Sequence, residues 1–89
     1  MNNVEELLRE YVAKNLLFSN DGYPYSDRTS FLEEGIVDSM GIMELVMFVE
    51  ETFETSVEDD ELIPDNFDSI ANLATYVRRK TRALSSEGR

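Results

Sequence analysis

The sequence predicts an all-α fold: a small four-helix bundle of three main helices and one short helix, with a long loop between helices 1 and 2. Three segments carry apolar residues at spacings of three and four, no segment alternates apolar and polar residues as a strand does, and no internal repeat is present. A chain of 89 residues is long enough for one hydrophobic core and too short for two. We therefore expect a single domain over residues 1–84 and a disordered tail at 85–89.

The first helix is predicted at residues 3–17, and a long loop follows it. The segment SNDGYPYSDRTS gathers turn-forming residues, so the loop is expected to continue to about residue 37. Loop aromatic residues, together with Leu32 and Ile36, are expected to anchor it to the core. The helix stripe is Val4, Leu7, Leu8, Tyr11, Val12 and Leu16, and the loop aromatics are Phe18, Tyr23, Tyr25 and Phe31.

The second helix is predicted to begin at Asp38 or Ser39, because either side chain can accept a hydrogen bond from a free N–H group of the first turn. Its inward stripe is Ile42, Leu45, Val46, Val49 and Phe53. A different flank carries Met40, Met43 and Met47 beside Glu44, Glu50 and Glu51. Methionine adapts to differently shaped partners and carboxylates attract basic ones, so we interpret this flank as a docking surface. Methionines that only fill gaps in the core are the alternative.

The remaining helices are one short turn and one long helix. The segment VEDDELIP predicts a short helical turn at residues 59–63, closed by Pro64. Its acids do not follow the ligand spacing of a calcium loop, so no metal site is expected. The last helix is expected to be capped at Asp68 or Ser69 and to bury Ile70, Leu73, Ala74 and Val77.

Composition excludes several functions. The chain has no cysteine and no histidine, so it lacks a disulfide framework and the usual zinc ligands. No signal peptide or membrane span is recognisable, and a cytoplasmic location is expected. The formal net charge is -11, and no Lys or Arg lies between Arg28 and Arg78. This negative field repels nucleic acid and anionic lipid, so neither is an expected partner. We also expect the protein to be a monomer.

Ser39 lies at the start of the second helix, and the sequence argues against a catalytic role for it. A nucleophilic serine needs a base such as histidine or lysine, and neither residue occurs near it. The four glycines are scattered and form no phosphate-binding loop. We therefore expect no catalytic residues and no enzymatic activity.

The run GIVDSMGIMELVMFVEETF, residues 35–53, resembles the attachment motif of the acyl carrier protein family, in which Asp-Ser-Leu or Asp-Ser-Met opens the second helix. The resemblance covers nearly the whole chain. It implies that Ser39 carries 4'-phosphopantetheine, transferred from coenzyme A by a magnesium-dependent phosphopantetheinyl transferase, and that Asp38 helps place the metal and the coenzyme of that enzyme. It also implies that a loading ligase or synthetase, and later transferases or synthases, dock through basic surfaces on Met40, Met43, Glu44, Met47, Glu50 and Glu51.

The cargo remains open between several classes. The resemblance implies acyl thioesters in fatty acid, polyketide or specialised metabolite biosynthesis. Gly41 stands where fatty acid synthase carriers commonly have an acid, and Asp-Ser-Met-Gly resembles D-alanyl carriers, so an aminoacyl carrier of D-alanyl or peptidyl type is the alternative. An acidic interaction module without an arm is a third reading. Phe48 occupies an often small position, which predicts poor shelter for long acyl chains.

Overall fold

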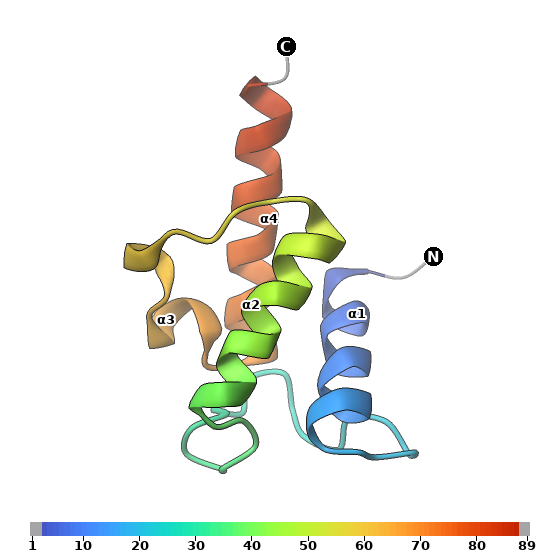
Figure 1. The fold of residues 1–89 in the computed structure, drawn as a ribbon. Coiled ribbons are helices and arrows are strands. Elements are labelled where there is room, and N and C mark those ends of the chain that lie inside the picture. Colours follow the sequence, from blue (N-terminus) through green and yellow to red (C-terminus); the bar gives the residue numbers. More distant parts are fainter. Residues whose placement is uncertain (1–2, 88–89) are drawn as a thin grey trace.

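The computed structural model describes residues 3–87, with side chains described as far as Thr81. The elements are α1 (Val4–Tyr11), a π-helical turn η1 (Val12–Leu16), α2 (Ser39–Phe53), a 3-10 turn η2 (Asp59–Glu61), α3 (Pro64–Phe67) and α4 (Ile70–Glu87). Figure 1 shows α2 crossing in front of α4, with α1 on one side and the short α3 on the other. The predicted all-α class of three main helices and one short helix is confirmed.

The first helix begins at a cap and ends in a wider turn. The Asn3 side chain accepts a hydrogen bond from the Glu6 N–H at 2.8 Å, which satisfies one free donor of the first turn. The N–H of Leu17 donates to the Val12 carbonyl at 2.9 Å, the five-residue spacing of a π-turn. The helical segment therefore matches the predicted residues 3–17 closely, but its last turn is π rather than α, a difference that apolar spacing does not reveal.

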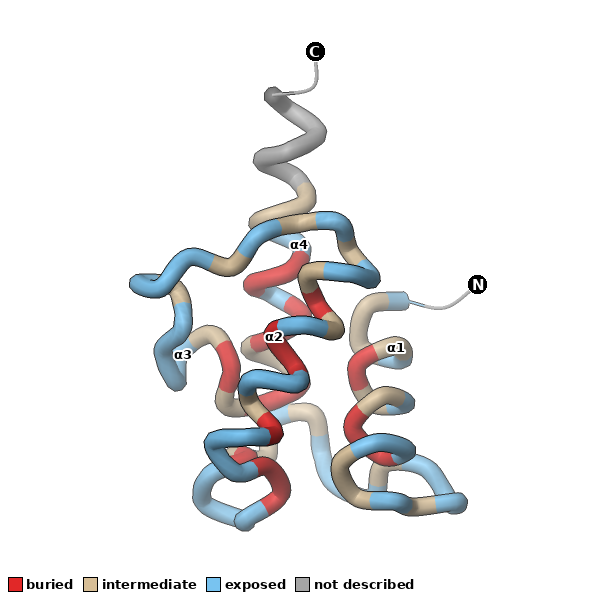
Figure 2. Tube along the Cα trace, in the orientation of Figure 1, coloured by how far each residue is buried: buried red, intermediate tan, exposed pale blue. Residues whose placement is uncertain are grey.

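The core lies where α1, α2 and α4 meet, and each of these helices carries buried positions, shown in red along the trace in Figure 2. Leu45, Val46 and Val49 of α2 are buried as predicted, while Ile42 and Phe53 of the same stripe are partly buried. The buried hydrophobic residues are Leu8, Val12, Ala13, Phe31, Ile36, Val37, Leu45, Val46, Val49, Phe67, Ile70, Leu73, Ala74, Tyr76 and Val77.

The loop at residues 18–37 is tied to α1 and to α4. Asp27 accepts two hydrogen bonds from the Arg9 guanidinium of α1, and its carbonyl accepts one from the Ala71 N–H of α4. Farther along, the carboxylate of Asp68 accepts hydrogen bonds from the Ser30 hydroxyl and the Leu32 N–H. The loop is therefore held by charge-assisted hydrogen bonds as well as by packing.

The predicted anchors of this loop are only partly correct. Phe31 and Ile36 are buried and hold the loop to the core. Phe18 and Leu32 are 82% and 56% exposed, so the expectation that they also anchor it was wrong. Phe18 has a left-handed backbone conformation with φ 53°, which turns the chain sharply after the π-turn and leaves its ring in solvent.

The role predicted for Pro64 was wrong. It was expected to close a short helix at residues 59–63, but it occupies the first turn of α3, while η2 is a separate turn before it. Proline suits that position because the missing N–H would have no helical partner there. Two short elements in sequence thus replace the one that was predicted.

The last helix is capped by Ser69, whose hydroxyl accepts a hydrogen bond from the Asn72 N–H at 3.0 Å. Asp68, the other candidate cap, instead binds the loop. The helix extends to Glu87 and so includes residues 85–87 of the expected tail, whose remaining residues, 88–89, lie outside the described part of the chain. No helix within the described residues is both long and apolar enough to cross a membrane.

Candidate functional site: the start of the second helix

The start of α2 presents a serine to solvent beside a capping carboxylate. Asp38 is the cap: its Oδ1 accepts a hydrogen bond from the Gly41 N–H at 2.8 Å, as the sequence predicted for this residue or its neighbour. Ser39 is the first residue of the helix and is exposed. Since the first N–H groups of a helix lack internal partners, an anionic group attached to Ser39 would meet them and the positive end of the helix dipole.

Gly41 is buried because the loop packs directly against it. A methyl group added at its Cα would lie 2.7 Å from Cγ1 of Val37, 3.4 Å from Oδ1 of Asp38 and 3.7 Å from Cδ2 of Leu16. The first of these distances is far below van der Waals contact. The glycine that the sequence presented as a departure from the fatty acyl pattern therefore allows the residues before Asp38 to approach the helix.

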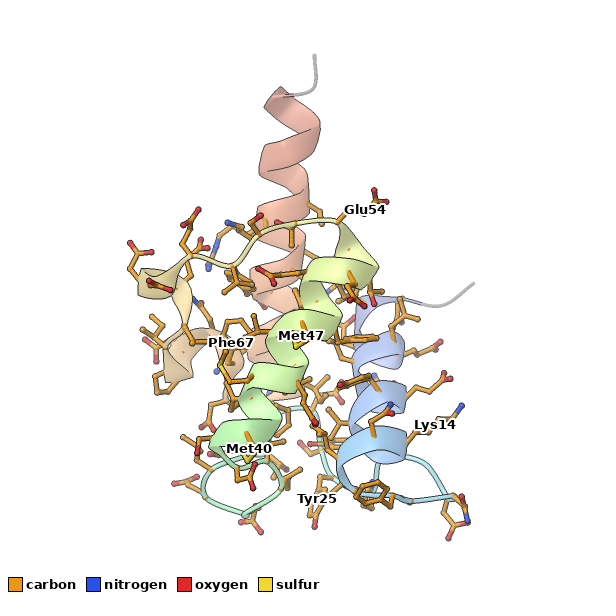
Figure 3. All side chains as sticks on the ribbon, in the orientation of Figure 1. Lys14, Tyr25, Met40, Met47, Glu54 and Phe67 are labelled. Atoms are coloured by element: carbon orange, nitrogen blue, oxygen red, sulfur yellow. The ribbon has the colours of Figure 1, made fainter. Side chains whose placement is uncertain are left out.

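The predicted docking flank of α2 is exposed in the structure. Met40, Met43 and Met47 are 79%, 53% and 59% exposed, and Glu44 and Glu51 are also exposed. Figure 3 shows Met40 and Met47 on the face of α2 turned toward the viewer, away from α4. The methionines therefore do not serve as core filling.

Glu50 differs from the other carboxylates of this flank. It is half-buried, and its Oε2 accepts a hydrogen bond from the Val57 N–H at 3.0 Å. This contact fixes the segment between α2 and η2 to the end of α2. Periodicity placed Glu50 beside the exposed residues but could not show that it has an internal partner.

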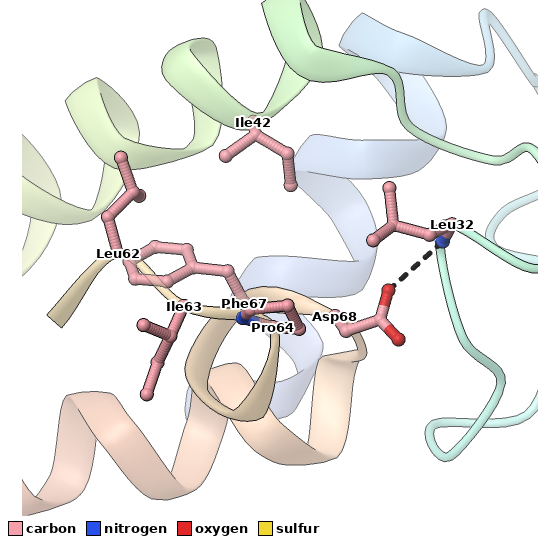
Figure 4. A pocket seen from close by; sticks show the side chains of 7 residues that line it. All are labelled: Leu32, Ile42, Leu62, Ile63, Pro64, Phe67 and Asp68. Carbon is pink, nitrogen blue, oxygen red and sulfur yellow. Dashed lines mark hydrogen bonds between the residues drawn. The ribbon is translucent and has the colours of Figure 1, made fainter.

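A small apolar pocket opens between α2 and α3, close to the start of α2. Its volume is about 160 Å³, and Asp68, which binds the Leu32 N–H, is its charged member (Figure 4). A cavity of about 150 Å³ lined by apolar side chains accommodates a molecule the size of benzene. The lining residues are Leu32, Ile42, Leu62, Ile63, Pro64, Phe67 and Asp68.

Sequence reasoning missed most of this pocket. The exposed residues Leu62 and Ile63 were assigned to a polar turn, and Leu32 was expected in the core. The sequence did contain a signal for it. Proline is common in the first turn of a helix, and large apolar residues often precede such a start, as Leu62 and Ile63 precede Pro64.

Phe48, which was predicted to take up volume that a long acyl chain would need, packs against the core between α1 and α2. Its ring stacks on Tyr11 at a centroid distance of 4.1 Å and contacts Phe53 edge-on at 6.2 Å. Phe48 therefore lies at the seam between α1 and α2 and does not line the pocket at α3. The reason is that Phe48 follows the docking flank by one residue, which turns it toward α1 rather than α3.

The fold and the site define a small acidic helical domain with a solvent-exposed serine at a helix start. Comparison with known proteins specifies that class. A family model described as a phosphopantetheine attachment site matches residues 6–77. The chain is 27% identical over 82 residues to an acyl carrier protein of Buchnera aphidicola, covering 92% of this chain and 99% of that protein. It is 30% identical over 78 residues to an acyl carrier protein of Akkermansia muciniphila, covering 88% and 92%.

The chain belongs to the acyl carrier protein family, because the family model spans most of its length. The cofactor of this family is covalently attached 4'-phosphopantetheine. The match favours the carrier over the armless interaction module considered from sequence. Acyl carrier proteins are carriers rather than catalysts, which is consistent with the expectation that this chain is not an enzyme.

Proposed function

We propose that Ser39 is the residue that carries the 4'-phosphopantetheine arm and that the loaded arm holds acyl intermediates as thioesters. The observation that carries this proposal is the exposure of Ser39 at the first position of α2, directly after the Asp38 cap. A transferase can reach a hydroxyl at that place, and a phosphodiester formed there is stabilised by the helix N-terminus.

The arm supplies chemistry that the chain lacks. The sequence contains no cysteine, so a thioester requires a thiol brought by the cofactor. Asp38 uses Oδ1 to cap the helix. We propose that its carboxylate also helps the phosphopantetheinyl transferase place its metal and coenzyme A.

Partner enzymes are proposed to dock on the exposed flank of α2. Their basic surfaces would meet Glu44 and Glu51, and the methionines would pack against apolar side chains beside those charges. These partners are a loading ligase or synthetase and the transferases or synthases of fatty acid, polyketide or specialised metabolite biosynthesis. A monomer in the cytoplasm fits this role.

An aminoacyl carrier of D-alanyl or peptidyl type is the second candidate. The small pocket favours it, since about 160 Å³ offers little shelter for a long chain and an aminoacyl group needs none. Gly41 after Asp-Ser-Met is the sequence feature that supports the same reading.

Intact-protein mass spectrometry tests the attachment site. The chain is incubated with coenzyme A, magnesium and a promiscuous phosphopantetheinyl transferase, and we expect a gain of one phosphopantetheine group. Ser39→Ala should abolish the gain, while Ser56→Ala, at another exposed serine, should leave it unchanged. A full gain in Ser39→Ala would place the arm elsewhere. Loading assays with acyl and aminoacyl ligases then decide between the two cargo classes.

A further inference from the structure

The loop after η1 contains a chemically labile peptide bond. Asp21 and Gly22 form the single Asp-Gly pair of the sequence, and both residues are exposed in a bend. At such a pair the glycine nitrogen can attack the side-chain carboxyl of the aspartate, because no side chain shields that nitrogen. The same reaction is slower at Asp-Ser pairs, of which the sequence has two, at residues 38–39 and 68–69.

The structure leaves the reacting groups of Asp21 and Gly22 without partners. Within residues 3–81, neither the Asp21 carboxylate nor the Gly22 N–H takes part in a hydrogen bond or an ion pair. Gly22 has φ 87°, and a methyl group added at its Cα would meet nothing within 4 Å beyond its chain neighbours. The carboxyl group can therefore rotate toward the glycine nitrogen without breaking a contact.

The two Asp-Ser pairs are restrained at helix starts. Oδ1 of Asp38 accepts the capping hydrogen bond from the Gly41 N–H at 2.8 Å. Both carboxylate oxygens of Asp68 accept hydrogen bonds, from the Ser30 hydroxyl and from the Leu32 N–H. Ring closure at either aspartate would break these hydrogen bonds and turn the backbone away from the helix start, so the fold opposes the reaction at both places.

We propose that the bond between Asp21 and Gly22 is a site of spontaneous isoaspartate formation, and that the fold protects the attachment motif at Asp38 from the same reaction. The Gly22 nitrogen forms a bond to Cγ of Asp21, and the carboxyl OH leaves as water together with the amide hydrogen. The product is a five-membered succinimide ring.

Water then opens the succinimide in one of two ways. Breaking the new bond between the nitrogen and Cγ restores aspartate. Breaking the original peptide bond leaves the main chain running through Cγ, which is isoaspartate with a free α-carboxylate. One water is lost and one is regained, so the mass is unchanged and nothing is oxidised or reduced. The α-carboxylate is the group that an S-adenosylmethionine-dependent isoaspartyl methyltransferase esterifies.

The product alters a turn that is held by one hydroxyl group. Oγ of Ser19 accepts a hydrogen bond from the Asp21 N–H at 3.2 Å and donates one to the Gly22 carbonyl at 3.0 Å. Isoaspartate adds one main-chain carbon between these two groups, so the two hydrogen bonds cannot both keep their present geometry. The modified bond lies in the loop after η1, and its formation does not require an arm on Ser39.

The test compares the three aspartates within one chain. The full chain without the arm is held for several weeks at neutral pH in water labelled with ¹⁸O, either folded or in guanidinium chloride. Digestion and electron-transfer fragmentation then locate isoaspartate. In the folded chain, isoaspartate should form at Asp21 about tenfold or more faster than at Asp38 or Asp68. In the denaturant, the rates at Asp38 and Asp68 should rise by roughly fivefold or more, while the rate at Asp21 changes by less than about threefold.

Variants identify the reacting groups. Gly22→Ala should slow the reaction by about tenfold, because its methyl group shields the attacking nitrogen. Asp21→Glu should stop it, since the longer side chain would have to close a six-membered ring. Asp21→Asn should form the same product faster, with ammonia leaving in place of water. Asp65→Glu, at another exposed aspartate, should leave the rate at Asp21 unchanged. Circular dichroism and thermal unfolding confirm that each variant folds.

Three outcomes would each overturn the proposal. They are equal rates at Asp21 and Asp38 in the folded chain, an Asp21 rate that rises more than about threefold on denaturation, and an Asp38 rate that does not rise on denaturation. None of these outcomes changes the mass-spectrometric result expected for Ser39, so the two proposals fail separately.

Discussion

The Asp38 carboxylate and the Gly41 N–H form the hydrogen bond that begins α2, at 2.8 Å. The same two residues flank Ser39, so the helix cap and the proposed attachment site share one turn of backbone. A change at Asp38 can therefore act on stability, on modification, or on both.

Substitutions at Asp38 separate these two roles. Asp38→Ala should lower the free energy of unfolding by about 1 kcal/mol, while Asp38→Asn keeps a capping oxygen and should change it by only a few tenths. Both should slow phosphopantetheinylation if the carboxylate serves the transferase. Urea unfolding and a time course of mass gain measure the two effects. A wild-type modification rate in Asp38→Asn would limit this residue to its structural role.

Gly41→Ala should destabilise the protein, although alanine at an exposed helix position gains about 1 kcal/mol over glycine. The added methyl group would lie 2.7 Å from Val37 Cγ1, a buried and branched side chain that cannot turn away freely. We expect a loss of about 1–3 kcal/mol in chemical unfolding. In a Val37→Ala background the same change should cost less, and an equal cost in both backgrounds would show that Val37 is not the obstacle.

Glu54→Gly should stabilise the protein. Glu54 ends α2 in a left-handed conformation with φ 51°, which costs a non-glycine residue about 1–2 kcal/mol, and its charge lies at the negative end of the helix. Allowing for the greater freedom of glycine in the unfolded chain, we expect a net gain of about 0.5–1 kcal/mol. Glu44→Gly, within the same helix, should lose about 1 kcal/mol. A loss in both variants would contradict this account of the helix end.

The side chain of Glu61 should make stability depend on acid pH. Its pKa is held below the ordinary value of a glutamate, first by the hydrogen bond from the Glu58 N–H and then by those from Lys80 and Tyr76, against an opposing effect of burial. A carboxylate with a lowered folded-state pKa stabilises the protein above the unfolded pKa, and this contribution is lost as the pH falls through the folded-state value.

Glu61→Gln isolates that contribution. The difference in free energy of unfolding between the natural chain and Glu61→Gln should be largest near pH 7 and should shrink below about pH 4. Acid also reduces the overall charge repulsion in a chain of net charge -11, which affects both proteins. Subtracting one free energy of unfolding from the other cancels most of this shared effect. Asp60→Asn, exposed on the same turn, serves as the charge-matched control. A difference that stays constant with pH would exclude Glu61 as a source of the dependence.

Cargo shelter should reach its limit at short chains. The pocket at α3 has a volume of about 160 Å³, near that of a cavity that holds benzene, so about six carbons fill it. Amide shifts of Ile42, Leu62 and Phe67 should grow from acetyl to hexanoyl loading and change little from hexanoyl to octanoyl. Further large changes in the amide shifts of core residues on octanoyl loading would show that the pocket expands. Phe48→Ala should not alter this series, because the ring lies outside the pocket.

The sequence predicted the main helices because their apolar stripes are long and regular. The stripe of α2 and the cap at Asp38 follow from spacing and side-chain chemistry alone, and the structure places both as expected. The exposed methionines were also predictable, since they share a flank that a bundle of this size cannot cover.

Other features depend on contacts between distant residues. Tyr76 was absent from the predicted stripe of α4, yet it is fully buried, because its hydroxyl finds a partner in Glu61. A proline at position 64 is compatible with the end of one helix or the start of another, and tertiary packing determines which of the two forms. Leu32 is exposed where its N–H binds the distant Asp68, and Phe18 is exposed where its left-handed backbone turns the chain; the apolar spacing indicates neither.

Those ties have a mechanical consequence for the carrier. Asp27 joins the loop to α1 and α4, and Asp68 joins it to the start of α4, so residues 27–32 of the loop that precedes α2 are held to the helical bundle. If Ser39 carries the arm as proposed, the attachment point follows a loop that is fixed to the helices, and the reach of the cargo is set by the length of the arm. The orientation in which the carrier docks would then decide which enzyme active site the arm can enter.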